Sequence, residues 1–330
     1  MSRCFTLLLT CTVVLGGCAS SGPVAPPARL YDGVDACARE VSTHSAAAQE
    51  WFDQGLTLLY GFNHEEAIRS FQRATELDPG CSMAWWGLAM ASGIDLNNSA
   101  MTEDDSRRAW DAAQQAAATA PGASPVEAAL AKAITTRYTW PAPEDRSELD
   151  VAYAQAMEAV SKEFPADPDV ACVYADSLML LQPWDYWTAE GEPKGRIEEA
   201  IAVLEVVLAE EPDHAGACHF YIHALEAGQP ERAIAAADRL LNRVPGAGHL
   251  LHMPSHIYVH VGRFADASDC NEIAIAADEA YFAVAPAHGF YQLYYAHNLH
   301  MLAFSAMMEG REKLATETAA QLVADIPASF

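Results

Sequence analysis

The histidines of this chain are concentrated in one part of its sequence. Ten of the twelve lie between His214 and His300. Within that stretch, eight histidines and one glutamate recur at spacings of three or four residues: His219, His223, Glu226, His249, His252, His256, His260, His297 and His300. Residues spaced in this way share one face of a helix. Three neighbouring segments therefore each present a stripe of side chains that are able to bind a metal.

Imidazole nitrogen is a good ligand for Zn, Cu and Fe, and two histidines at i, i+4 can chelate one ion. Glu226 would act as a carboxylate ligand, as a general base, or as an acceptor that orients His223. A single histidine of this kind is more often a hydrogen-bonded core residue. The whole set instead favours a transition-metal site, to which Asp176 would add a carboxylate. We interpret His44, His64 and His288 as structural or surface residues.

A proline, Pro254, lies inside the longest histidine stripe and indicates where the helix of that stripe begins. Pro254 would cost about 3 kcal/mol in a helix interior. We therefore predict a helix that starts near Pro254 and carries His256 and His260, with His249 and His252 on the loop before it. Such a loop would let the backbone wrap around a ligand.

The N-terminus is typical of an exported protein. A basic start at Arg3 precedes the mostly apolar run 4–15, which is too short to span a membrane. The following Leu-Gly-Gly-Cys, at 15–18, resembles the bacterial lipoprotein processing box. This resemblance implies a signal peptide over 1–17 and lipidation of Cys18, and Ala19 after that cysteine is similar to lipoproteins sorted to the outer membrane. We expect a tether over 18–44 and a folded region over 45–330, which would extend further if the chain is a fragment.

The net charge and the cysteine content of the chain exclude several classes of function. Nineteen basic residues oppose 45 acidic ones, so the formal net charge is 19 − 45 = −26. That charge argues against nucleic-acid binding and against electrostatic docking on anionic lipid, which leaves a lipid anchor as the contact with a membrane. The five cysteines after Cys18 are far apart and form no CxxC pair, so neither a disulfide framework nor a cysteine-rich zinc site is indicated.

A repeat organises the rest of the chain. Small, aromatic and proline residues follow the spacing of a 34-residue helix–turn–helix unit at Trp51, Gly55, Ala67, Phe71, Ala74 and Pro79. The second half of the pattern returns before Pro212, Pro245 and Pro327. From about residue 48 to 328 the chain resembles the tetratricopeptide (TPR) family. This predicts an all-α solenoid of about seven units, two of which carry insertions, at 94–105 and around 182–195.

Three histidine-containing phrases narrow the resemblance. The segments 218–226, 249–260 and 294–300 are similar to a His-rich bacterial lipoprotein branch of the TPR family, and this resemblance implies no particular reaction. In such solenoids the first helix of each unit lines the concave surface, where ligands bind. His249 and His252 occupy the places in their unit that His297 and His300 occupy in the next. We therefore expect the histidines to face one cavity, with Trp184 and its neighbours as a lid or as packing.

Two functions are compatible with this pattern. The first is a membrane-anchored lipoprotein of the cell envelope, facing the periplasm, whose histidine-lined concave site binds Zn, Cu or Fe. The second is a TPR scaffold that grips a protein or peptide in its concave face, with neither metal nor catalysis. The sequence has no HExxH phrase, no Ser-His-Asp order and no phosphate-binding glycine loop. It therefore leaves open whether the protein is an enzyme.

Overall fold

The predicted all-α solenoid is confirmed. The computed structural model describes residues 28–285 and 289–325, so Cys18 and the expected signal peptide lie outside the described residues. Within the described part the secondary structure is helical, with one isolated bridge between Trp187 and Pro193 and no strand. In that part, no helix is both long enough and apolar enough to cross a membrane.

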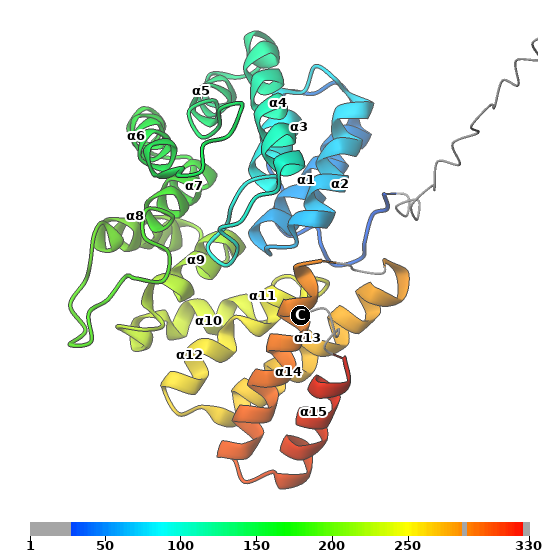
Figure 1. Ribbon diagram of the computed structural model, residues 1–330, viewed down its shortest axis with the longest axis vertical. Coiled ribbons are helices and arrows are strands. Elements are labelled where there is room, and N and C mark those ends of the chain that lie inside the picture. The colour runs from blue at the N-terminus through cyan, green and yellow to red at the C-terminus, as the bar shows by residue number, and fades with distance from the viewer. Residues whose placement is uncertain (1–27, 286–288, 326–330) are drawn as a thin grey trace, which may run out of the picture.

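In the described part of the chain the helices form seven pairs if α11 and α12 are taken together, in agreement with the predicted number of units (Figure 1). The pairs are α1 (Ala46–Tyr60) with α2 (His64–Leu77), α3 (Ser82–Ala91) with α4 (Glu103–Thr119), α5 (Pro125–Ile134) with α6 (Ser147–Glu163), α7 (Pro168–Met179) with α8 (Ile197–Glu210), α9 (Ala215–Leu225) with α10 (Ile234–Leu240), α11 (Gly248–His252) and α12 (Pro254–His260) with α13 (Phe264–Val284), and α14 (Tyr291–Met308) with α15 (Glu312–Asp325). Short 3₁₀ turns, η1 (Ala120–Gly122) and η2 (Pro230–Ala233), adjoin α4 and α10.

Small residues let the helices approach at the positions that the repeat reserves for them. The ring of Phe71 on α2 fills the space between α1 and α3. A Cβ atom added to Gly55 would lie 2.7 Å from that ring, and one added to Gly87 would come closer still. The first two units therefore depend on one aromatic ring packed between two glycines, because any larger residue would force the helices apart.

The helix predicted to start near Pro254 and to carry His256 and His260 is confirmed as α12, but the segment before it differs from the prediction. His249 and His252 lie on a short helix, α11, and not on a loop; the prediction of a loop was wrong. Met253 between α11 and α12 keeps helical dihedral angles (φ −50°, ψ −38°), so Pro254 interrupts the helix without unwinding it. Pro254 lacks an N–H, so it cannot donate to the helical hydrogen-bond ladder at that point.

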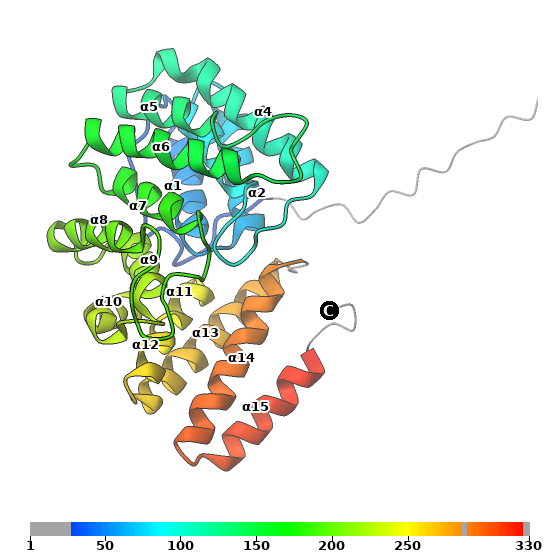
Figure 2. The ribbon, with the colours of Figure 1, turned by 60° about the vertical axis from the view of Figure 1, so that its left-hand side comes forward.

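The solenoid curves until its first unit contacts its last ones. In both views the ends of α13 and α14 (orange) lie beneath the first pair of helices (blue) (Figures 1 and 2). The Tyr281 hydroxyl on α13 donates to Glu66 of α2 at 3.0 Å, across 215 residues of sequence. The ring of Tyr31 packs edge-on against Tyr281 at 5.4 Å. The concave side is therefore closed around its circumference as well as lined by helices.

Candidate metal centre

Histidines from four helices meet on the concave side. They fall into two groups of three. Within each group, one ring nitrogen from each histidine lies within 4.8 Å of those of the other two. The first triad is His219 and His223 of α9 with His249 of α11. The second triad is His252 of α11, His256 of α12 and His297 of α14. Each triad therefore joins two or three helices that are apart in sequence, as ligands of a metal site usually are.

In the second triad the three Nε2 atoms face one another. The Nε2 atom of His256 lies 2.9 Å from that of His252 and 3.4 Å from that of His297. Two imidazoles bound to one tetrahedral ion at about 2.0–2.1 Å would hold their nitrogens about 3.3 Å apart. The His256–His297 separation matches this value, and the His252–His256 separation is a little shorter.

Hydrogen bonds on the far side of each ring fix which nitrogen carries the hydrogen. His252 Nδ1 lies 2.7 Å from Asn271 Oδ1, and Asn271 Nδ2 donates to the carbonyl oxygen of Ala267 at 2.7 Å, which sets the orientation of the amide. His252 Nδ1 must therefore be the donor. The Nδ1 atom of His256 lies 2.6 Å from a carboxylate oxygen of Glu226, which only accepts. In their neutral forms both rings turn an Nε2 lone pair inward.

The first triad is built in the same way. His219 Nδ1 donates to the carbonyl oxygen of Tyr60 at 2.6 Å, and His223 Nδ1 donates to the second oxygen of Glu226 at 3.0 Å. His249 Nε2 lies 3.2 Å from His219 Nε2. The buried atoms His223 Nε2 and His249 Nδ1 have no hydrogen-bond partner among the described residues. A buried nitrogen without a partner is costly in a folded protein, so these two atoms require an explanation.

Glu226 links the two triads through its two carboxylate oxygens. Burial opposes its ionisation, but the charge of His256 and the hydrogen bonds from His223 and His256 outweigh that penalty and hold the pKa of Glu226 well below its usual range. Burial also works against a charged His256, yet the neighbouring carboxylate raises the pKa of His256. One negative charge is therefore shared between two imidazoles at the centre of the cluster.

The remaining imidazoles are held neutral. Burial lowers the pKa of His219, His249 and His252 well below the ordinary value, and repulsion from adjacent histidines adds to the effect. Burial and the neighbouring His256 lower the pKa of His297 to about 3. Neutral imidazole is the form that binds a metal, so these rings are prepared as ligands at neutral pH.

Aromatic side chains and both insertions cover the first triad. The ring of Phe62 stacks on His223 and His249 at 5.9 and 5.5 Å, and Trp184 contacts His223 edge-on at 5.1 Å. Among the described residues, Phe62 and Trp184 are the two non-glycine positions with positive φ, +54° and +65°. Strain of this kind costs about 1–3 kcal/mol and gathers at ligand sites. Here both strained residues touch the same histidine.

The insertions meet above the site. Trp184 Nε1, from the insertion between α7 and α8, donates to the carbonyl oxygen of Leu96 in the insertion between α3 and α4. Asn97 of that second insertion contacts the Tyr294 hydroxyl at 3.3 Å, and the ring of Tyr294 packs on His249 at 4.4 Å. Trp184 therefore packs against both His223 and the insertion between α3 and α4, and these contacts are compatible with either predicted role of its loop, lid or packing.

Seven of the nine candidate ligands come together in this cluster. His260 and His300 are exposed and belong to neither triad. Asp176 lies elsewhere on α7, near the buried Arg137, and burial raises the pKa of Asp176 to about 7. Three residues that contact the histidines, Asn271, Phe62 and Tyr294, were not predicted as part of the site. Asn271 carries a signal that was available, because it is a polar residue one turn after the small residue Ala267 on the inner face of its helix.

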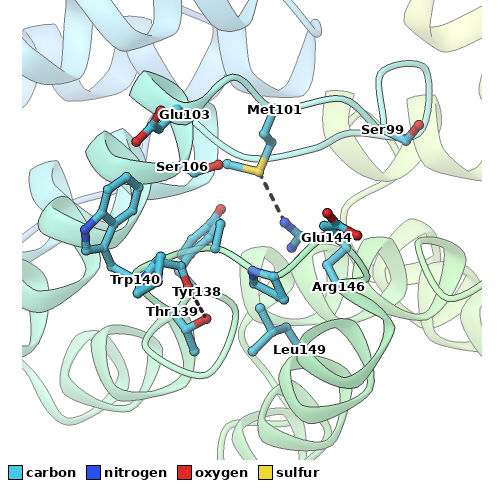
Figure 3. Close-up of a pocket in the computed structure, with 13 residues that line it drawn as sticks. Ser99, Met101, Glu103, Ser106, Tyr138, Thr139, Trp140, Glu144, Arg146 and Leu149 are labelled. Atoms are coloured by element: carbon cyan, nitrogen blue, oxygen red, sulfur yellow. Dashed lines mark hydrogen bonds between the residues drawn. The ribbon is translucent and has the colours of Figure 1, made fainter.

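A separate cavity opens away from the histidines. It has a volume of ≈ 390 Å³ and lies between the insertion near Met101 and the loop that follows Tyr138 (Figure 3). Arg146 Nη1 points to the sulfur of Met101 at 3.2 Å across this cavity. None of the nine candidate ligands lines it. It supplies no donor set for a metal, and the histidine cluster remains the candidate site.

One comparison with known families agrees with the repeat pattern over part of the chain. Residues 194–251, from the loop before α8 into α11, match the Tetratricopeptide repeat family. No curated protein matches the chain. Two structures of human IFIT1 dimers, with PPP-AAAA and with m7Gppp-AAAA, align with 84% of this chain and 72% of their own at 14% and 13% identity, with TM-scores of 0.41 and 0.39. The chain is a helical solenoid that contains a tetratricopeptide repeat region over residues 194–251.

Proposed function

We propose that this solenoid binds a transition-metal ion through the Nε2 atoms of the second triad. One observation carries the proposal: the Nε2 atoms of His252 and His256 lie 2.9 Å apart while both Nδ1 atoms are committed as donors to other groups. Two neutral rings in this state would direct lone pairs at each other. A cation between them relieves that repulsion, and His297 Nε2 supplies a third donor.

The ligand set selects the class of metal. Three imidazoles suit Zn, Cu or Fe and provide neither the oxygen ligands that Mg and Ca require nor thiolates. Three protein ligands leave one tetrahedral position open for water or for another small ligand, as at catalytic zinc sites. Asn271 and Glu226 would orient the rings from outside, which is the usual role of groups hydrogen-bonded to metal-binding histidines.

A proton is the competing occupant of the same position. If His256 is an imidazolium, its Nε2–H can donate to His252 without any metal. In the peptide-binding scaffold this proton would occupy the position between the rings, and no metal would be needed. In the metalloprotein a metal ion would displace the proton. Metal content therefore separates the two functions.

The test compares two histidines of α14. Protein purified without an affinity tag would be analysed for bound metal, then stripped and titrated with Zn²⁺. We expect near-stoichiometric binding that His297→Ala weakens strongly and that His300→Ala, the exposed histidine one turn further along, leaves unchanged. Absence of uptake at micromolar Zn²⁺, or equal binding by the two variants, would favour the scaffold.

We further propose that lipidated Cys18 anchors the solenoid to the outer membrane, facing the periplasm. The support is the Leu-Gly-Gly-Cys phrase followed by Ala19. Cys18→Ser should move the protein from the membrane to the soluble fraction, or leave it as an unprocessed precursor. A wild-type protein that already fractionates as soluble would contradict the anchor.

A further inference from the structure

We infer that the first triad holds a second ion, so that the two triads form one two-metal centre organised by Glu226. This inference rests on the proposed function, because it assigns a second position beside the first. It concerns His219, His223 and His249, whose ring nitrogens converge in the same manner as those of the second triad.

The first triad has unused donor capacity. His219 and His223 both donate through Nδ1, to the Tyr60 carbonyl oxygen and to Glu226, so their Nε2 atoms carry lone pairs when neutral. His223 Nε2 is buried and has no partner among the described residues. His219 is fully buried and His223 is 2% exposed, so no solvent compensates for the missing contact. An ion bound by the triad would use both lone pairs.

The two triads are in contact through their rings and share one carboxylate. Rings of different triads lie side by side, with centroids 5.9 Å apart for His249 and His252 and 6.2 Å apart for His223 and His256. The same carboxylate accepts a hydrogen bond from His223 with one oxygen and from His256 with the other. Paired metal sites in proteins hold their ions about 3.5–4 Å apart. Glu226 therefore positions ligands of both ions without binding either.

Access favours a small ligand for the open coordination positions. Phe62, Trp184 and Tyr294 cover the first triad, and a cavity of ≈ 180 Å³ reaches Phe62 from the side of His64 and Asp95. Phe62 lines that cavity and also stacks on His223 and His249, so it touches both the cavity and the first triad. The geometry suits a ligand the size of water or azide that donates through oxygen or nitrogen.

The experiment counts ions and measures their separation. Untagged full-length protein would be stripped with a chelator, reloaded with Cu²⁺ or Co²⁺, desalted and analysed for metal. We expect about two equivalents in the wild type and in His300→Ala, about one in His249→Gln and in His297→Ala, and none in the double variant. Cu²⁺-loaded wild type should show an electron paramagnetic resonance spectrum altered by coupling between the two ions. Each single variant should instead show the spectrum of one isolated Cu²⁺.

Circular dichroism of the metal-free variants controls for folding, and His219→Gln replaces His249→Gln if the latter does not fold. One equivalent in the wild type, lost only in His297→Ala, would overturn the two-metal centre and leave the proposed function intact. Two equivalents with the spectra of isolated ions would also overturn it, because the sites would be independent. No uptake by the wild type would remove the proposed function itself.

Discussion

His252 and His256, one helical turn apart across Pro254, point their Nε2 atoms at each other at 2.9 Å while their Nδ1 atoms are bonded outward. Asn271 holds the first ring and Glu226 holds the second. Two hydrogen-bonded rings of this kind cannot both be neutral without a cation between them, and either a proton or a metal ion fills that role. The predictions below distinguish the two.

Metal affinity should fall with decreasing pH by about tenfold per unit below the pKa of His256, since one proton competes with one ion. The sign follows from the pKa of His256, which Glu226 raises: a proton binds there first as pH falls. His252 and His297 have lowered pKa values and stay neutral over the same range. Isothermal titration with Zn²⁺ between pH 8 and pH 5 measures the slope. A slope of three protons would mean that all three rings titrate together.

Glu226→Gln should weaken metal binding by about 10- to 100-fold, the usual cost of losing a group that orients metal-binding histidines. The amide keeps the size of the side chain but loses the charge that stabilises His256, so the pKa of His256 should also drop and the pH dependence should shift to lower pH. Glu231→Gln on the exposed turn η2 is the control. Unchanged affinity and pH dependence would show that Glu226 does not position the rings.

Trp184→Gly should accelerate metal exchange with little loss of stability. Glycine accepts the φ of +65° without strain, which offsets part of the lost packing of a side chain that is 50% exposed. The rate of Zn²⁺ transfer to a coloured chelator should rise, because the edge of the indole no longer covers His223. Asparagine also tolerates positive φ and is smaller than tryptophan, so Trp184→Asn should raise the rate of Zn²⁺ transfer as well. Equal exchange rates in all three proteins would exclude Trp184 as a cover.

Gly228→Val should destabilise the fold by about 1–3 kcal/mol through overpacking. A Cβ atom at Gly228 would collide with the indole of Trp187, whose Nε1 donates to the carbonyl oxygen of Ala224 at the end of α9. A Cβ atom added at Gly262 would meet no atom within 4 Å, although the residue has a φ of +78°. Asparagine tolerates positive φ, so Gly262→Asn should destabilise the fold less than Gly228→Val and serves as the comparison. Chemical denaturation measures both. A Gly228→Val protein as stable as the wild type would contradict the packing.

Much of the fold is predictable because the repeat is a local pattern. Gly55 and Phe71 stand at their expected places in the repeat, and the ring of Phe71 fills the space that Gly55 leaves. The repeat pattern did not predict that Gly248–His252 is helical, or that Met253 keeps helical dihedral angles between α11 and α12. Proline weighs against a helix in isolation, but burial of Leu250 and Met253 in the core outweighs that preference.

The site is predictable only in part. Spacing identified the stripes, and it could not tell that His260 and His300 turn to the surface one helical turn beyond the contact between helices. Division into two triads depends on the angle between α9, α11 and α14, which no sequence spacing encodes. The carbonyl oxygen of Tyr60, 159 residues from His219, belongs to the site because of the curvature of the whole solenoid.

The closure of the solenoid makes the centre depend on units that are far apart in the chain. Tyr60 and Phe62 come from the unit of α1 and α2 and His297 from that of α14 and α15, so a growing polypeptide has no finished binding site until both units have been synthesised and folded. An ion that binds only the closed form also holds the two ends of the solenoid together, by an amount that grows with the logarithm of its concentration. Metal supply would then govern how long the folded protein survives proteolysis, and starvation for the ion would open the molecule at the contact between Glu66 and Tyr281.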